Sequence, residues 1–270
     1  IVSKNGEVSV WDLVSNKILN RFQTSRQTTS AAVNKKKNIL AIGSLGKQKL
    51  TVWNITTGNQ ITDFSASTMN SKAITAIAFD ELGSKLLIGD SKGRIYGWNL
   101  DPESRMAEPF TFETLHSKPI KKIVFSPNND HFVSSAGIDG LCLFWKWKSK
   151  SVAHAYQHET ELTDMLFSAE DQLIASSASG EIIGVDFSRQ TRISDFKNEE
   201  NYEEFLATLP DDKEELAREK LIAFYDWPTY IKNPAILSKI KTACRKDSFV
   251  AHDARINAIN LMGDELLTVG

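Results

Sequence analysis

The sequence has 270 residues with 32 lysines and arginines against 34 acids, a net charge of −2 that gives no positive field for a nucleic-acid backbone. The composition, 41% hydrophobic and 24% charged residues, supplies enough apolar material for a core and excludes disorder throughout. The two cysteines, Cys142 and Cys244, stand in unlike contexts, which favours a reducing compartment over a disulfide framework or a thiolate metal cage.

Five blocks of similar sequence recur along the chain. They are GEVSVWDL (6–13), KLTVWNI (49–55), GRIYGWNL (93–100), GLCLFWKW (140–147) and GEIIGVDF (180–187). Their matching positions, Trp11, Trp53, Trp98, Trp145 and Val185, are 42, 45, 47 and 40 residues apart. This spacing is typical of a propeller blade of four strands.

Each block is flanked by further apolar runs separated by polar turns. AITAIAFD (73–80) and GSKLLIGD (83–90) precede the third block, and NKILNRF (16–22) follows the first. Short runs of β-branched and aromatic residues between Gly, Asn, Asp and Lys predict strands and turns. We therefore predict four short strands in each period.

The repeat at 115–147 resembles the WD-repeat β-propeller family. Leu115-His116 stands where the family has Gly-His, SSAGIDG (134–140) resembles its turn, and Trp145 its tryptophan. The resemblance covers 1–197 and 249–270. It implies that His116, Ser135, Asp139 and Trp145 form a buried hydrogen-bond network within the blade.

Other repeats depart from the family pattern. Lys92 and Ser179 occupy the Asp position before the turn glycine, and Val185 replaces the tryptophan. We expect those blades to depend mainly on apolar packing.

Both ends of the chain fall within a repeat. Residues 1–22 read as the third and fourth strands of one blade, and 255–269 as the first and second strands of another. Propellers can close by combining strands from both termini, which would give five blades here. Because there is no initiator Met and the chain stops within a strand, we expect a larger ring, and the resemblance implies seven blades.

The β pattern is interrupted between the blades. Residues 198–248 contain DDKEELAREKLIAFYDW, in which apolar residues recur at helical spacing, so we expect a helical insertion that separates blades at 1–197 from the start of the next blade at 249–270. Residues 198–220 carry a net charge of −6 and 221–247 a net charge of +3. TRISDF (191–196) reads as an outer strand, which predicts that the insertion joins it to the next inner strand.

No motif for catalysis, a cofactor or a metal is found in the sequence. The phosphate-loop motif GxxxxGK[ST] and the nucleophile motif GxSxG are both missing. His154 and His158 fall on an expected outer strand, where residues four apart project side by side and do not converge on one metal ion. Trp147 and Trp227 lie outside the repeat register, so we expect them to be exposed and to bind partners. The candidate partner-binding residues are Trp147, Trp227, Lys239, Lys241 and Arg245.

These observations favour a non-catalytic scaffold for protein–protein interaction. The expected partners are other proteins rather than nucleic acid or membrane, since the longest uncharged stretch is the polar segment 50–62. The expected location is the cytoplasm. The alternative is a sensor or regulatory propeller domain of a larger multidomain enzyme or signalling protein, which sequence beyond either end would reveal.

Overall fold

The computed structural model shows a chain built of β-strands. It describes residues 1–24, 27–45, 49–65, 73–100, 109–112, 115–128, 131–136, 139–169, 172–186, 245–262 and 265–270. Within these ranges the regular elements are strands, and no helix occurs.

The strands are short. In chain order they are β1 Glu7–Asp12, β2 Lys17–Gln23, β3 Thr28–Asn34, β4 Ile39–Ser44, β5 Lys49–Asn54, β6 Gln60–Ser65, β7 Ile74–Phe79, β8 Lys85–Asp90, β9 Ile95–Asn99, β10 Phe110–Thr111, β11 Ile120–Phe125, β12 His131–Ala136, β13 Leu141–Lys146, β14 Val152–Gln157, β15 Leu162–Phe167, β16 Gln172–Ser177, β17 Glu181–Asp186, β18 Arg245–Val250, β19 Ala258–Met262 and β20 Glu265–Val269.

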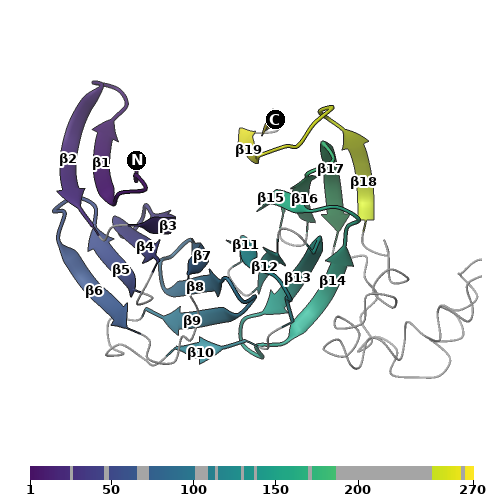
Figure 1. Cartoon of the computed structure of the whole chain (residues 1–270), viewed down its shortest axis with the longest axis horizontal. Coiled ribbons are helices and arrows are strands. Elements are labelled where there is room, and N and C mark those ends of the chain that lie inside the picture. The colour runs from purple at the N-terminus through teal and green to yellow at the C-terminus, as the bar shows by residue number, and fades with distance from the viewer. Residues whose placement is uncertain are drawn as a thin grey trace, which may run out of the picture.

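Four antiparallel sheets of four strands follow one another as blades. They are β3 to β6, β7 to β10, β11 to β14 and β15 to β18, each paired in chain order. The first strands β3, β7, β11 and β15 contact one another in sequence and lie on the inside of an arc (Figure 1). The predicted propeller fold is therefore confirmed.

The core lies between neighbouring blades. Trp98 packs with Ile39 and Ala41 of the preceding blade, and Trp145 packs with Leu87 of the blade before its own. Their exposed fractions are 2% and 1%. Each tryptophan thus joins its blade to the one before it, which explains why the aromatic residue recurs once per period.

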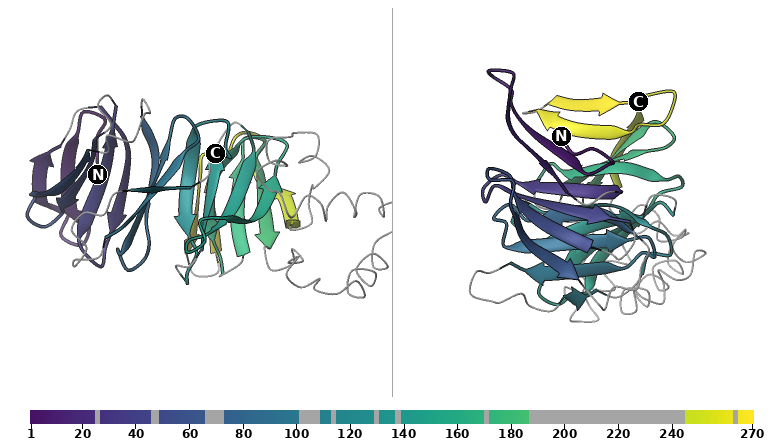
Figure 2. Two further views of the ribbon diagram at one scale, coloured as in Figure 1. Left: turned by 90° about the horizontal axis from the view of Figure 1, so that it is seen from below. Right: turned by 60° about the vertical axis from the view of Figure 1, so that its left-hand side comes forward.

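The two ends of the arc are half-blades. β1–β2 and β19–β20 form separate two-stranded sheets that do not pair with each other, and an open gap separates them (Figure 1, Figure 2). They supply the two strand pairs predicted for 1–22 and 255–269. The described strands do not form a closed ring of five blades, since β1–β2 and β19–β20 remain separate sheets.

The outer strand of the last complete blade differs from the expectation. β18 pairs with β17, with Phe249 opposite Ile182 and Arg245 opposite Val185. Residues 245–250 therefore belong to this blade, and Phe249 lies within its outer strand rather than opening the next blade. TRISDF (191–196) lies outside the described residues. The two segments have similar short apolar patterns, and register with β17 distinguishes them.

This pairing changes the face from which the intervening segment leaves. The ends of β17 and β18 that flank residues 187–244 correspond to the strand ends joined by the turns at 55–59 and 146–151. In the order of the chain, these residues therefore connect the third and fourth strands of one blade, and not an outer strand with the next inner strand. The helical character expected for 198–244 falls outside the described residues and stays a prediction.

Candidate functional site

The turn between β12 and β13 contains the acid that the family resemblance singled out. Asp139 accepts a hydrogen bond from the backbone N–H of Leu141 at 3.0 Å, and its Oδ2 lies 3.7 Å from Nδ1 of His116. His116 is 3% exposed and belongs to the loop that leads into β11. The structure thus places the His116 imidazole within ion-pair distance of the Asp139 carboxylate, a contact that is an ion pair when the imidazole is protonated.

The other two predicted network residues lie in the same blade. Ser135 is on β12, where its backbone is opposite Cys142 of β13. Trp145 is buried opposite Phe132, and their rings stack with centroids 6.0 Å apart. Participation of all four side chains in one hydrogen-bond network stays a prediction.

Asp90 stabilises the corresponding turn of the preceding complete blade. This carboxylate is 1% exposed and accepts backbone hydrogen bonds from Lys92 at 2.8 Å and Arg94 at 3.0 Å. It also accepts a hydrogen bond from Nε of Arg94 at 2.8 Å and forms an ion pair with Nη2 at 2.8 Å. Burial raises the pKa of the neighbouring Tyr96 phenol, and the charge of Asp90 raises it further.

Ser177 has the equivalent place in the last complete blade. Its Oγ accepts a hydrogen bond from the N–H of Glu181 at 3.1 Å and lies 2.7 Å from Oγ of Ser179. The turns of the two departing blades therefore have hydrogen-bond acceptors in addition to the apolar packing that was expected of these blades. The acceptor stands earlier in each turn than the family position, which is why motif matching missed it.

The turn glycines connect each blade to the next. Gly93 has φ +80°, and a Cβ added there would lie 2.2 Å from the carbonyl oxygen of His116. Gly180 has φ +83°, and its added Cβ would lie 2.0 Å from the carbonyl oxygen of His252. The positive φ of these residues and the short distance to a carbonyl oxygen both require glycine. At both positions, the loop that contains the histidine of one blade therefore packs directly against the turn of the previous blade.

Polar contacts also join the inner strands. Asp164 Oδ1 lies 2.8 Å from Nζ of Lys122 on β11, and Oδ2 accepts a hydrogen bond from the N–H of Ile259 on β19 at 3.1 Å. Glu161 receives two hydrogen bonds from Arg255 at 2.7 and 2.8 Å, which lower the pKa of this carboxyl. Asp164 therefore links its own blade to the preceding blade and to the half-blade that follows.

The residues predicted to bind partners divide into three groups. Trp147 is 8% exposed and makes an edge contact with Phe110 at 5.1 Å, so the expectation that it is exposed is wrong. The cluster of phenylalanines around it, contributed by two blades, covers its ring. Trp227, Lys239 and Lys241 lie outside the described residues, and Arg245 begins β18.

Neither a metal site nor a membrane-spanning helix is found among the described residues. Over these parts of the chain, no three His, Cys, Asp or Glu side chains gather where they could hold a metal ion. Nor is there, in the same residues, a helix with the length and hydropathy needed to cross a membrane.

Comparison with known proteins agrees with this architecture. The profile of the family "WD domain, G-beta repeat" matches residues 109–146. Human "Protein NEDD1" is 25% identical over 179 residues, which are 65% of this chain, and the chain spans 26% of that protein's length.

Two solved structures share the fold. The computationally designed Ika8 protein superposes with a TM-score of 0.63 at 17% identity, over 98% of this chain and 63% of the other. A chain of the Mitotic Checkpoint Complex superposes with a TM-score of 0.68 at 14% identity, over 98% of this chain and 66% of the other. The repeat at 109–146 thus matches the WD domain, and the described strands have the architecture of a β-propeller.

Proposed function

We propose that this chain is a non-catalytic scaffold that binds other proteins. WD-repeat domains generally serve as protein-interaction scaffolds, and the arrangement of the blades fits that role. The observation that supports the proposal most is the way neighbouring blades are fixed to each other. The buried Trp98 and Trp145, the turn glycines Gly93 and Gly180, and the inner-strand contacts of Asp164 all join one blade to another. Such a frame holds its surface loops in fixed positions, as recognition requires.

The segment between β17 and β18 is the recognition element in this proposal. Its two anchor points are adjacent, since Val185 and Arg245 are paired, so 187–244 can extend from one face without opening the blade. The sequence of 198–220 is strongly acidic and that of 221–247 basic. We assign partner contact to Trp227, Lys239 and Lys241 within it, and propose that the partners are cytoplasmic proteins rather than nucleic acid or membranes.

The experiment replaces 187–244 by the five-residue turn 55–59, Ile-Thr-Thr-Gly-Asn. This turn joins β5 to β6, where Gln60 lies opposite Trp53 as Arg245 lies opposite Val185, so the graft preserves the register. Tagged intact and grafted chains are then used in parallel pull-downs with quantitative mass spectrometry. We expect the grafted chain to keep its β-sheet circular dichroism and to lose at least one partner.

A control on the same face separates recognition from general charge. Lys148→Ser with Lys150→Ser alters the exposed turn between β13 and β14 and leaves 187–244 intact. This variant should keep the partner that the graft loses. Equal recovery of all partners by the intact and grafted chains would remove the segment as the recognition element.

A further inference from the structure

Three equivalent turns join a third strand to a fourth strand: 12–17 after β1, 54–59 after β5 and 146–151 after β13. Each begins directly after a tryptophan that is paired across the turn. The pairs are Trp11 with Ile18, Trp53 with Gln60, and Trp145 with Val152. The three turns therefore have the same length and can be compared position by position.

The first residue of the turn is a polar cap in two of the three cases. Asp12 Oδ1 accepts a hydrogen bond from the N–H of Val14 at 2.9 Å, and Asn54 Oδ1 accepts one from the N–H of Thr57 at 2.9 Å. The equivalent residue of the third turn is Lys146, whose side chain has no acceptor atom. This turn thus has a positive charge where the other two have a cap.

The fifth residue of the turn has a left-handed backbone in all three cases. The φ angles are 53° for Asn16, 71° for Gly58 and 56° for Lys150. Glycine and asparagine adopt this conformation at the least cost, whereas a lysine there is strained. Strain that another residue would relieve points to a use of the side chain. Lys150 is therefore a second lysine at a position where the fold favours a different residue.

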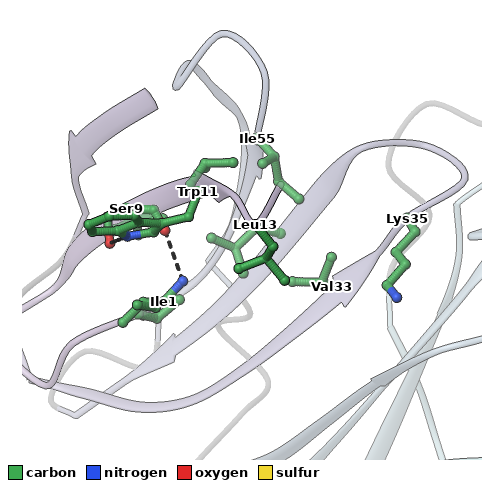
Figure 3. A pocket seen from close by; sticks show the side chains of 11 residues that line it. Ile1, Ser9, Trp11, Leu13, Val33, Lys35 and Ile55 are labelled. Carbon is green, nitrogen blue, oxygen red and sulfur yellow. Dashed lines mark hydrogen bonds between the residues drawn. The ribbon is translucent and has the colours of Figure 1, made fainter. Parts of the chain in front are cut away.

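The lysines of the third turn alternate with a buried residue. The second position of each turn is apolar, and Leu13 and Ile55 at this position line one hollow between the first half-blade and its neighbour (Figure 3). Trp147 is the equivalent residue and is buried against Phe110. The residues on either side of it and beyond are exposed lysines, namely Lys146, Lys148 and Lys150.

Aromatic rings hold ammonium groups at the base of this turn. Nζ of Lys150 lies 4.5 Å from the ring centroid of Phe110, and Nζ of Lys85 on β8 lies 5.2 Å from that of Trp147. The two rings make an edge contact with centroids 5.1 Å apart. A cation over an aromatic face is attracted by the ring, so lysines from two blades are placed over one aromatic pair.

The charges of the turn are not neutralised by neighbouring acids. Elsewhere in the blades, Lys36 Nζ lies 2.7 Å from Glu81, and Lys122 Nζ lies 2.8 Å from Asp164. In the part of the chain that the structure describes, no ion pair involves Lys146, Lys148 or Lys150. Their positive charge is therefore open to an anionic ligand.

We propose that the surface formed by Lys146, Lys148 and Lys150 binds an acidic segment of a partner protein. Lysine ammonium groups act as separate point charges, which suits carboxylates spaced along a peptide. An extended peptide places alternate side chains on one face about 7 Å apart, so acids at alternate positions can meet successive lysines. The net charge of −2 disfavours a nucleic acid as the ligand. This inference rests on the proposed scaffold function and gives it a contact surface outside 187–244.

The probe is a peptide of alternating glutamate and serine, about nine residues long, labelled for fluorescence anisotropy. The matched probe has glutamine in place of every glutamate. We expect saturable binding of the glutamate peptide to the 270-residue chain, at least about tenfold tighter than that of the glutamine peptide. Added salt should weaken it, because the charges are exposed.

A double variant separates binding from stability. Lys146→Asn introduces the cap that Asn54 supplies, and Lys150→Asn introduces the residue present at Asn16. Together they should weaken binding of the glutamate peptide about tenfold or more, yet raise the urea midpoint, because a cap is gained and strain is reduced. A merely structural role for the lysines would not produce both effects.

The control variant removes the same charge elsewhere. Lys92→Asn with Lys118→Asn changes two exposed lysines in loops at the opposite ends of the strands. It should bind the glutamate peptide as the parent does. An equal loss of binding in this control would overturn the inference, as would equal binding of the glutamate and glutamine peptides. A lowered urea midpoint in the double variant would assign its lysines to stability instead.

Two further measurements identify the occupant. A single-stranded oligonucleotide of the same charge should compete poorly, and equal competition would reduce the surface to a general binder of polyanions. The chain with 187–244 replaced by the turn 55–59 should bind the peptide as the parent does. A clear gain in affinity would show that acidic residues 198–220 of the chain itself occupy the surface, which would overturn the assignment to a partner. Failure of the peptide to bind would leave the proposal for 187–244 standing, because the probe does not report on that segment.

Discussion

Replacing Asp90 by alanine is expected to destabilise the blade β7 to β10 by about 3 kcal/mol. The carboxylate is 1% exposed, and the change removes its two backbone hydrogen bonds together with the bond and ion pair to Arg94. Removing one partner of a buried ion pair costs about 3–5 kcal/mol. The Arg94 side chain is 24% exposed and can regain some hydration, which puts the expected loss near the lower limit.

The asparagine variant separates charge from shape. Asp90→Asn keeps one oxygen that can cap the turn but loses the attraction to Arg94, so we expect a smaller loss of about 1–2 kcal/mol. Lys92→Ala is the control, since it changes an exposed side chain of the same turn and keeps the backbone N–H that Asp90 accepts.

Urea unfolding followed by tryptophan fluorescence measures the free energies. Hydrogen exchange at 86–98 detects loss confined to one blade, which matters because repeat arrays can depart from two-state behaviour. The reasoning would be refuted by a loss under about 1 kcal/mol for Asp90→Ala. It would also be refuted if Lys92→Ala were equally damaging.

Three other substitutions address the contacts between blades and at turns. Gly180→Ala should cost about 2 kcal/mol or more because of its positive φ and the nearby carbonyl of His252, with the loss read from the thermal midpoint. Glu161→Gln should lower stability at pH 7 by about 1 kcal/mol or less. The hydrogen bonds from Arg255 hold the pKa of Glu161 below its usual 4.5, so its contribution is present above pH 4.5 and is lost as the pH falls through the lowered pKa. The stabilities of the variant and the parent should therefore converge in acid unfolding curves below pH 4.5. Asp139→Ala should destabilise β11 to β14 by about 1–3 kcal/mol, measured by urea unfolding, and an unchanged midpoint would count against its role in the turn.

Repeat spacing predicted most of the fold because one residue type marks the same structural position in each blade. Trp53, Trp98 and Trp145 all lie on the third strand, and the run of four strands around them follows from short alternating patterns. These signals are local, and β-strand periodicity reports them directly. The pairing of strands that lie far apart in the sequence is not visible in such local patterns. For this reason the outer strand of the last complete blade was expected at 191–196, whereas the structure has β18 there.

The environment of single side chains was harder to predict. Trp147 stands two residues beyond Trp145, outside the repeat position, and exposure was the natural expectation. In the fold, Phe110 and Phe125 come from different blades to cover it, at ring distances of 5.1 and 5.8 Å. Such burial depends on the packing of one blade against another, which a pattern along one strand does not contain.

The turns show which features the fold requires and which can vary. Each complete blade from β7 onward needs an acceptor for the backbone N–H groups of the turn between its second and third strands, and Asp90, Asp139 and Ser177 each supply one from a different sequence context. A backbone N–H that is exposed can donate to water, but a backbone N–H that is covered by the loop of the next blade cannot. Such a covered N–H in the turn therefore needs an acceptor from the protein. The physical requirement is therefore broader than the family motif. At Lys92 and Ser179 the sequence departs from that motif, and there Asp90 and Ser177 accept the hydrogen bonds of the turn instead.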